Sequence, residues 1–468
     1  IASDNDVTTL AKSGDEVTLT ITASETVTSL VCTMDGEATT MGGSGTSWTS
    51  RLTLSGDETE GTLGVSCASF VDAAGNTGNT DTSVDTGTVT VDLTAPVVGI
   101  GTVATDGYIN AAEAPSFTIT GTATGANGQT VTVTYGGASE TATVSSGTWT
   151  MSMCDDESCS HAAGLSAVTA NINDAAGNAA TQANVNAWYD ATAPTTTISA
   201  IDISADTGSS ATDFITKTAS QTVTATLSTA LATGETLQIS LNAGTSWAND
   251  DHATADGTSV SIASQTLSGS SQIQFRILDL AANAGAVASQ AYVLDTTAPT
   301  LGTVGIGTGG SGDANDGDTV TLTFTATETI QSPTCTMKDG GANTMDNSVT
   351  VANPTGNTWT CAVDTNNADA DGAMTFSIAF SDVGGTAGIA DTTVDDGSAV
   401  TIDNTHPSAS AVTIAVTGSG NANDGDVVTL TIDPSETIGA PTCTWTDGSG
   451  AMEDTSVNYG TVDDTDHR

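Results

Sequence analysis

Two stretches of alternating residues, Val17-Thr-Leu-Thr-Ile-Thr22 and Val320-Thr-Leu-Thr-Phe-Thr325, decide the fold class. In each, an apolar residue alternates with threonine, so that one face of an extended strand is apolar and the other is polar. Val131-Thr-Val-Thr-Tyr135 and Val428-Thr-Leu-Thr-Ile432 repeat the pattern. Turns rich in glycine, asparagine and aspartate separate such stretches, and no long segment carries a helical stripe. The sequence therefore predicts an all-β protein of antiparallel, half-buried strands.

Two short motifs recur in a fixed order and define a repeating unit of about 100 residues, the size of an immunoglobulin-like (Ig-like) sandwich. One motif is Asp-x-Thr-x-Pro. The other, 16 to 21 residues earlier, is an aspartate followed four residues later by asparagine or threonine. Their first residues are, in chain order, Asp72 and Asp92, Asp174 and Asp190, Asp279 and Asp295, and Asp382 and Asp403.

These markers predict five Ig-like domains, which we call modules. Modules 1 and 5 are shorter than the others, so we expect both to be incomplete. Asp295 is followed by Cys335 and Asp403 by Cys443, each time after 40 residues, and the equivalent of Cys361 in module 5 would lie just beyond the last residue. We therefore expect a window on a longer array, or a subunit completed by a strand of a neighbouring copy. The predicted modules are 1–92, 93–190, 191–295, 296–403 and 404–468.

Composition excludes several classes of function. The chain has 468 residues and a formal net charge of −49, and such an acidic surface repels nucleic acid. No apolar stretch is long enough for a membrane span. Aromatic residues make up only 4 %, which indicates several small domains with thin cores. Paired carboxylates recur once per repeat and no catalytic motif is present, so we expect no enzyme.

Taken together, the motifs allow a resemblance to be named. Asp92-Leu-Thr-Ala-Pro96, Gly14-Asp-Glu-Val-Thr-Leu-Thr20, Thr22-Ala-Ser-Glu25 and Asp72-Ala-Ala-Gly-Asn76 are similar to motifs of the bacterial Ig-like repeats of very large surface adhesins and biofilm-associated proteins. Such modules also occur in surface-layer proteins. The resemblance covers essentially the whole chain. It implies tandem Ig-like β-sandwich domains in an elongated rod, and an extracellular, cell-surface structural role.

The cysteines depart from that family, since most such repeats contain none. We expect disulfides, which require an oxidising compartment and therefore secretion. A zinc site is the other interpretation, but the chain lacks paired Cys-x-x-Cys spacings. The expected pairs are Cys32 with Cys67, Cys154 with Cys159, and Cys335 with Cys361.

Acidic residues are expected to meet where one module joins the next. In a sandwich, the end of the second strand, the loop before the last strand and the incoming linker share one pole, so three carboxylates would converge there. Calcium is bound by such hard oxygen ligands, and we expect it to make the rod rigid. Alternatively, aspartate and asparagine serve there only as turn residues. The expected sites are Asp92 with Asp174, Asp190 with Asp279, Asp295 with Glu328 and Asp382, and Asp403 with Glu436.

Tryptophans recur at comparable places in the modules, each after a glycine-containing turn. They are interpreted as core or edge anchors, and carbohydrate stacking is the alternative. The tryptophans are Trp48, Trp149, Trp247 and Trp359.

The sequence thus predicts the repeat stalk of an adhesin-like protein or filamentous appendage. Its partners would be neighbouring copies or further repeats of the same long chain, with cell-surface or glycan ligands bound by regions outside this window. The alternatives are a self-assembling surface-layer or filament subunit (a cell-surface hair) and a glycan-binding module.

Overall fold

The computed structural model describes residues 1–155, 159–250, 257–310, 312–418, 420–423, 425–439, 441–447 and 450–451. Every regular element within these ranges is a β-strand, which confirms the all-β prediction. In this part of the chain no helix could cross a membrane. Contacts between Cα atoms divide the chain into two units, Ile1–Ser204 with Ala219–Tyr292, and Ala205–Thr218 with Val293–Arg468.

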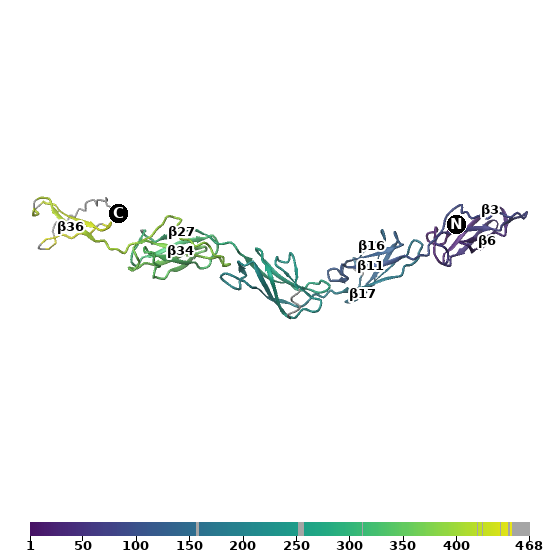
Figure 1. Ribbon diagram of the computed structural model, residues 1–468, viewed down its shortest axis with the longest axis horizontal. Helices are drawn as coiled ribbons and strands as arrows, with labels where there is room; N and C mark the ends of the chain where they lie inside the picture. The colour runs from purple at the N-terminus through teal and green to yellow at the C-terminus, as the bar shows by residue number, and fades with distance from the viewer. Residues whose placement is uncertain are drawn as a thin grey trace. The chain divides into compact units, whose positions relative to one another are not determined.

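Module 1 consists of short strands around one long antiparallel pair. The strands are β1 (Ala2–Ser3), β2 (Leu10–Ala11), β3 (Glu16–Thr28), β4 (Val31–Met34), β5 (Glu37–Ala38), β6 (Thr40–Thr53), β7 (Gly61–Thr62), β8 (Val65–Ala68), β9 (Val71–Asp72) and β10 (Thr90–Val91). They form the sheets β1-β3-β6 with β9 on β3, β2-β10-β7 and β5-β4-β8. The long strands β3 and β6 are labelled in the purple part of the ribbon (Figure 1). The alternating stretch lies in β3, where Val17 and Leu19 are buried against Cys32 and Met34.

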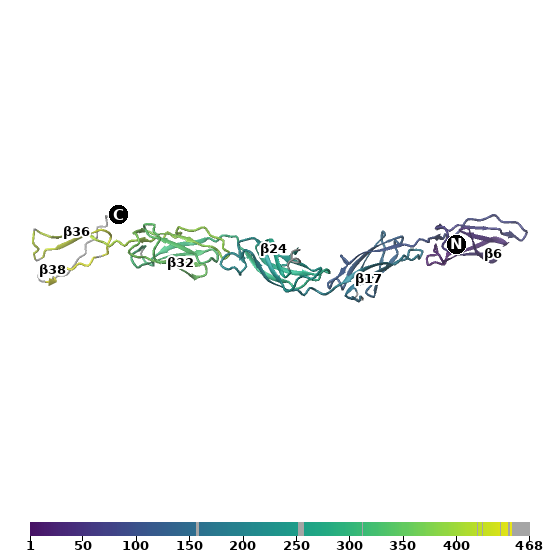
Figure 2. The ribbon, with the colours of Figure 1, turned by 60° about the horizontal axis from the view of Figure 1, so that its bottom comes forward.

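Module 2 is a sandwich of a three-stranded and a five-stranded sheet. Its strands are β11 (Val97–Val103), β12 (Tyr108–Ile109), β13 (Phe117–Thr124), β14 (Thr130–Tyr135), β15 (Ala138–Thr143), β16 (Thr148–Met153), β17 (Gly164–Asn171) and β18 (Ala183–Tyr189). The sheet orders are β11-β13-β16 and β12-β18-β17-β14-β15. β17 is labelled in the blue part of the ribbon (Figure 2). Val131 and Val133 point into the core, as the alternation predicts.

Module 3 repeats the arrangement of module 2. Its strands are β19 (Ile198–Ile203), β20 (Ile215–Thr216), β21 (Ser220–Leu227), β22 (Thr236–Ser240), β23 (Ala248–Asp250), β24 (Ser259–Thr266), β25 (Ser270–Leu278) and β26 (Ala288–Leu294). One sheet has the order β19-β21-β24, and in the other β26, β25, β22 and β23 follow one another. In the second unit, Ile215 and Thr216 pair with Val293 and Leu294.

Module 4 resembles module 1 in having three sheets, of order β27-β29-β32-β31, β28-β35-β33 and β30-β34. Val320, Leu322 and Phe324 of the predicted strand are fully buried. The strands are β27 (Leu301–Gly307), β28 (Asp313–Ala314), β29 (Thr319–Ala326), β30 (Thr334–Lys338), β31 (Thr350–Thr355), β32 (Thr358–Asp364), β33 (Gly372–Ala373), β34 (Thr375–Ala379) and β35 (Thr401–Ile402).

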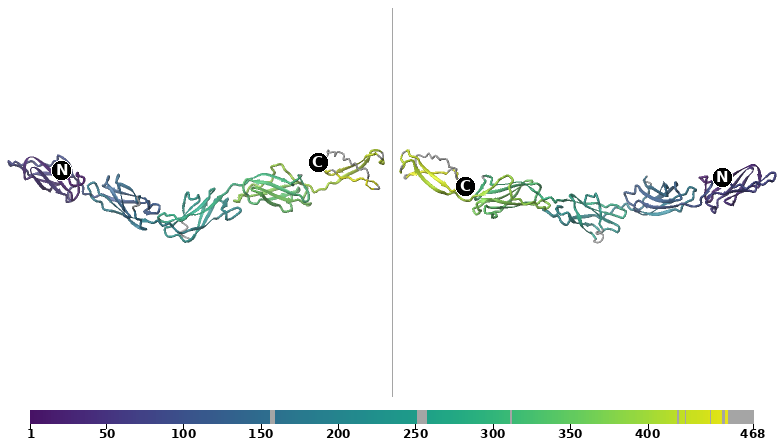
Figure 3. Two further views of the ribbon diagram at one scale, coloured as in Figure 1. Left: turned by 180° about the vertical axis from the view of Figure 1, so that it is seen from behind. Right: turned by 45° about the horizontal axis from the view of Figure 1, so that its top comes forward.

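The described part of module 5 contains two strand pairs. They are β36 (Ala409–Val416) with β37 (Val428–Pro434), and β38 (Thr446–Asp447) with β39 (Gly450–Ala451). β36 and β37, coloured yellow, run side by side (Figure 3). Val412 and Ile414 of β36 are 59 % and 67 % exposed. The rest of the predicted module, residues 452–468, lies outside the described residues.

Each of the first four modules also contains one short parallel pair that joins an early strand to the last one. In this pair, the early strand runs in the same direction as the strand that leads out of the module. The pairs are β2 with β10, β12 with β18, β20 with β26, and β28 with β35.

Candidate metal centre at the module junctions

The aspartate of each second motif folds its own loop into a closed turn. In module 2, the backbone N–H of Asn178 donates to Asp174 Oδ1 at 2.9 Å, and Asn178 Nδ2 donates to Asp174 Oδ2 at 3.0 Å. Asn283 makes the same two bonds to Asp279, both at 2.9 Å. In these two loops, the carboxylate therefore has a donor on both oxygens, as expected for aspartate in a turn.

The same asparagine also reaches the linker that enters its module. Asn178 Nδ2 donates to the carbonyl oxygen of Asp92 at 2.8 Å, and Asn283 Nδ2 to that of Asp190 at 2.7 Å. An amide nitrogen carries two hydrogens, so one side chain can close its turn and hold the linker at once. The first two junctions are thus joined by hydrogen bonds from a partly buried asparagine.

A second set of bonds supports these two junctions. Asn5 Nδ2 of module 1 donates to the carbonyl oxygen of Ala176 in module 2 at 2.7 Å. The backbone N–H of Ala111 in module 2 donates to Asn283 Oδ1 of module 3 at 3.1 Å. Each loop therefore binds both the linker and the body of the preceding module.

The third junction has the same loop with one changed residue. Thr386 stands where the other loops have asparagine; its N–H donates to Asp382 Oδ1 at 2.8 Å and its hydroxyl to the carbonyl oxygen of Asp295 at 3.2 Å. A threonine has no second donor for the remaining carboxylate oxygen. Asp382 is fully buried, and its Oδ2 has no hydrogen-bond partner. A buried oxygen of this kind is costly without a donor or a cation.

Two further carboxylates lie beside Asp382. Asp295, Glu328 and Asp382 each offer an oxygen, and these atoms lie within 4.8 Å of one another. Burial, followed by the nearby charges of Asp295 and Asp382, raises the pKa of Glu328 above its ordinary value. Among the described residues, this is the group of three carboxylates whose oxygens lie close enough to share a metal ion.

The dimensions and chemistry of this group fit calcium. Oxygens on opposite sides of a Ca²⁺ ion, each at about 2.4 Å, are about 4.8 Å apart. Three carboxylates supply up to six oxygens, and water can complete the shell. The unpartnered Oδ2 of Asp382 and the mutual repulsion recorded in the pKa of Glu328 are the two features that a cation would relieve.

The other predicted metal residues are arranged differently. Asp92 and Asp174 are near neighbours: burial, together with the charges of Asp174 and Glu60, raises the pKa of Asp92. Asp403 is exposed and its Oδ1 accepts the N–H of Thr405. Glu436 has a buried Oε1 without a hydrogen-bond partner. Neither these residues nor Asp190 with Asp279 form a group of three in the described part of the chain.

Sequence reasoning missed an acidic residue that holds the outgoing linker. Glu60 accepts the N–H of Leu93 at 3.0 Å and the hydroxyl of Thr94 at 2.5 Å. In module 4, Asp371 takes the N–H of Asn404 and the hydroxyl of Thr405 in the same way. These donors lower the pKa of both carboxyls. Glu60 directly precedes Gly61, and Asp371 directly precedes Gly372. This shared acid–glycine pair is the sequence feature that could have identified both residues.

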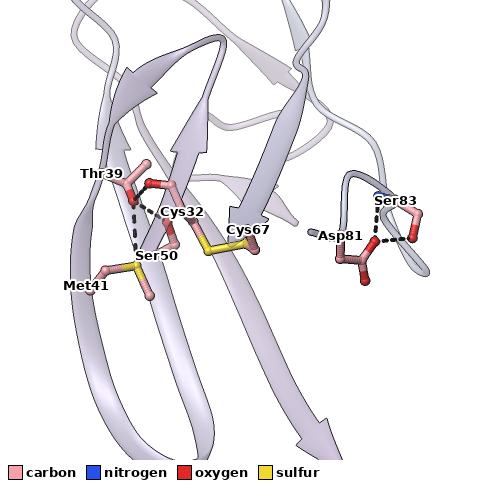
Figure 4. Close-up of a disulfide and its surroundings, with 7 residues drawn as sticks. All are labelled: Cys32, Thr39, Met41, Ser50, Cys67, Asp81 and Ser83. Atoms are coloured by element: carbon pink, nitrogen blue, oxygen red, sulfur yellow. Dashed lines mark hydrogen bonds between the residues drawn. A yellow bond between two sulfur atoms is a disulfide. The ribbon is translucent and has the colours of Figure 1, made fainter. Parts of the chain in front are cut away.

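The expected disulfides are present. The two that join cysteines far apart in the sequence differ in whether they link strands of one sheet or of two sheets. Cys32 and Cys67 face one another on the adjacent strands β4 and β8 of one sheet (Figure 4). Cys335 of β30 is joined to Cys361 of β32, which belongs to another sheet. The third disulfide joins Cys154 to Cys159.

The position in module 1 that corresponds to Cys361 is Ser50. Both residues lie two places after a tryptophan and pair with a buried leucine of the neighbouring strand. Ser50 is fully buried, and its hydroxyl bonds to that of Thr39, which in turn donates to the carbonyl oxygen of Cys32 (Figure 4). A hydroxyl network therefore replaces the disulfide between the sheets.

One of the four recurring tryptophans does not occupy the position that the comparison of the modules with one another predicted. Trp48, Trp149 and Trp359 lie in β6, β16 and β32, which pair with β3, β13 and β29. Trp247 instead lies between β22 and β23, in the loop of a hairpin of the other sheet. The prediction that all four are equivalent is wrong for Trp247, because Gly-Thr-Ser-Trp occurs in two structural settings.

Comparison with known proteins gives matches among solved structures. No family model and no curated protein match the sequence. A structure from a 1.5-MDa bacterial ice-binding adhesin is 22 % identical, covers 66 % of this chain and 98 % of its own, and has a TM-score of 0.27. A tetra-tandem repeat from the extending region of a large adhesion protein is 20 % identical, with 84 % and 96 % coverage and a TM-score of 0.28. Titin domains I67–I69 match at 11 % identity, with 67 % and 97 % coverage and a TM-score of 0.24.

Proposed function

We propose that this chain is a non-enzymatic structural protein of the cell exterior, the repeat stalk of an adhesin-like protein or filamentous appendage. The observation that carries the proposal is the recurring junction bond: at three successive junctions, a side chain of the second motif donates to the carbonyl oxygen of the linker aspartate. The donors are Asn178, Asn283 and Thr386. A bond repeated at each junction serves the connection between modules rather than a single site.

The disulfides support an extracellular location. Such bonds persist in oxidising compartments, and each of the three closes within one module. They stabilise modules that have few aromatic residues, each by about 2 to 4 kcal/mol. The acidic composition keeps such a chain soluble and discourages unspecific association.

We further propose calcium at the third junction, bound by Asp295, Glu328 and Asp382. The buried Oδ2 of Asp382 supports this site, because no donor in the described residues satisfies it. At the first two junctions, the loop asparagine already occupies both oxygens of its aspartate. Calcium at Asp92 with Asp174, Asp190 with Asp279, or Asp403 with Glu436 stays a prediction.

Calorimetric titration of the chelator-stripped full chain with calcium tests the site. We expect Asp382→Asn to remove the binding event, and Asp313→Asn, the same charge change at an exposed residue of module 4, to preserve it. Calcium binding that survives Asp382→Asn would place the ion elsewhere, and absence of binding would reject the metal.

The stalk and the self-assembling filament differ in their state of association. Sedimentation of the purified chain at micromolar concentration, with and without calcium, separates them. A monomer in both conditions supports the stalk. Polymers would favour the filament subunit and contradict the stalk.

A further inference from the structure

We propose that module 3 binds a single neutral saccharide ring in a cavity beside Trp247. The cavity has a volume of about 320 Å³ and lies between the loop that joins β22 to β23 and the end of β24. This inference is independent of the stalk and calcium proposals. Trp48, Trp149 and Trp359 occupy equivalent strands and are interpreted as packing anchors, but Trp247 lies in a loop. That interpretation therefore does not extend to the indole of Trp247.

Module 3 lacks the hairpin tyrosine of module 2; instead Tyr292 of β26 lies at the cavity, 2 % exposed, with its hydroxyl donating to the carbonyl oxygen of Leu241 at 2.9 Å. In module 2, Tyr135 stands two residues after Val133, is 1 % exposed, and packs edge-on against Phe117 at 5.3 Å. The corresponding residue of module 3, two after Ile239, is Leu241, which lines the cavity. The module 2 hairpin turns through two glycines, whereas the module 3 hairpin has a longer loop, 241–247. At this corner, module 3 therefore combines a smaller hairpin side chain and a wider loop with the cavity.

The walls combine an aromatic face with neutral polar groups. The indole of Trp247 is half-buried, and the amides of Asn242 and Gln265 also line the cavity. Gln265 Nε2 donates one hydrogen to the carbonyl oxygen of Ala263 and keeps a second for a ligand. The hydroxyls of Ser246 and Ser268 are further polar groups of the wall. None of the described residues that line the cavity is charged.

The loop beside the cavity is held in place before any ligand arrives. Ser240 is 2 % exposed; its hydroxyl donates to Asn242 Oδ1 at 2.8 Å and accepts the N–H of Gly244 at 2.9 Å. The guanidinium of Arg276 lies 4.2 Å from the centre of the Trp247 ring, and its Nε is bound to Gln238 at 2.7 Å. A fixed indole and a fixed amide lower the entropic cost of binding.

The opposite wall contains an irregularity that the corresponding strand pairs of modules 2 and 4 lack. The register of β24 against β21 shifts between Gln221 and Val223, and Ser264 has a φ of 59°. The corresponding strand pairs of modules 2 and 4, β13 with β16 and β29 with β32, run without a shift. Bulges of this kind re-aim neighbouring side chains and recur next to binding sites. Gln265 is the residue that follows the bulge.

These features together define the class of ligand. An indole packs against the C–H face of a pyranose, while amides and hydroxyls bond to the ring hydroxyls. The volume is at the lower end of the range of small-molecule pockets, about 300 to 1,000 Å³, so one ring fits. One cation, Arg276, stacks on the Trp247 ring, but the lining residues are neutral and the net charge of −49 disfavours acidic sugars. The ligand is therefore a neutral hexose or N-acetylhexosamine, free or at the end of a glycan.

Saturation-transfer NMR on the full chain tests the proposal, with the methyl pyranosides of glucose, galactose, mannose and N-acetylglucosamine as probes. We expect at least one to bind with a millimolar dissociation constant. Trp247→Ala should weaken that binding about tenfold or more, and Gln265→Ala about fivefold. Trp188→Ala, which removes a tryptophan that is 45 % exposed on module 2, should leave it unchanged.

Three results would overturn the proposal. They are absence of saturation transfer from all four probes, binding that neither Trp247→Ala nor Gln265→Ala weakens, and tighter binding of methyl glucuronide than of methyl glucoside. Gln265→Ala changes a half-buried residue at the cavity wall, so it keeps the test valid if Trp247→Ala disturbs the loop. Melting curves of both variants identify such a disturbance.

Discussion

The substitution Thr386→Asn should convert the third junction into one that needs no calcium. The three loops have the same backbone bonds: in module 4, the N–H of Asp382 donates to the carbonyl oxygen of Thr386 at 3.0 Å, and the equivalent bonds in modules 2 and 3 are 3.1 and 3.2 Å. An asparagine at position 386 can therefore reach Asp382 Oδ2 as Asn178 reaches its own aspartate. It would also retain a donor for the carbonyl oxygen of Asp295.

The magnitude follows from the burial of Asp382. A hydrogen bond to a buried charged group contributes about 1.5 to 3 kcal/mol, and here it also satisfies an oxygen that has no partner. We expect module 4 of the variant to be about 2 kcal/mol more stable than the original in calcium-free buffer. For a domain of about 100 residues this corresponds to a rise in melting temperature of about 10 °C.

Differential scanning calorimetry of the full chain, with chelator and with calcium, measures the effect. Calcium should raise the melting temperature of the original module 4 and have little effect on the variant, whose Asp382 Oδ2 is already bonded. The reciprocal change, Asn283→Thr, should lower the stability of module 3 by a similar amount. A Thr386→Asn variant that is unchanged or less stable in chelator would refute the reasoning.

Three further predictions follow from the site and the disulfides. The folded-state pKa of Glu328 is raised, so ionisation of Glu328 destabilises the calcium-free fold as the pH rises through that pKa. Calcium binds the ionised carboxylate, so titration calorimetry should show the calcium affinity falling as the pH drops through the same pKa. Reduction should lengthen the extension released when modules 1 and 4 unfold under force, by about 120 Å for the 35-residue disulfide separation and about 90 Å for the 26-residue one; equal extensions before and after reduction would contradict it. Ser50→Cys combined with Cys67→Ser should move the disulfide of Cys32 to position 50, and peptide mapping that finds both thiols free would rule this out.

Local patterns predicted the strands because a period of two is a property of the strand itself. Val17 and Val320 are buried as the alternation requires, and the cysteine pairs lie on strands that such patterns place close together. The acidic group at the third junction was also anticipated, since Asp295, Glu328 and Asp382 do converge.

The sequence did not predict which hydrogen bonds each side chain makes at the junctions. The residue four positions after the loop aspartate decides whether both carboxylate oxygens of that aspartate have a donor. Asn178 and Thr386 both donate to the carbonyl oxygen of the linker, and this long-range contact is visible only in the structure. Trp48 and Trp247 end the same tetrapeptide, Gly-Thr-Ser-Trp, yet one lies in a strand and the other in a hairpin loop. Long-range strand pairing decides between these settings, and no local pattern encodes it.

The short parallel pairs determine how each module resists tension. A first strand, β1, β11, β19 or β27, precedes the early strand of the pair, and the chain leaves the module along the partner of that early strand. A pull on the two ends therefore loads the two strands of the parallel pair in shear. Their hydrogen bonds lie across the direction of sliding and must break together rather than in succession. The early and last strands of a module can therefore be separated by a pull only when this one small clamp shears.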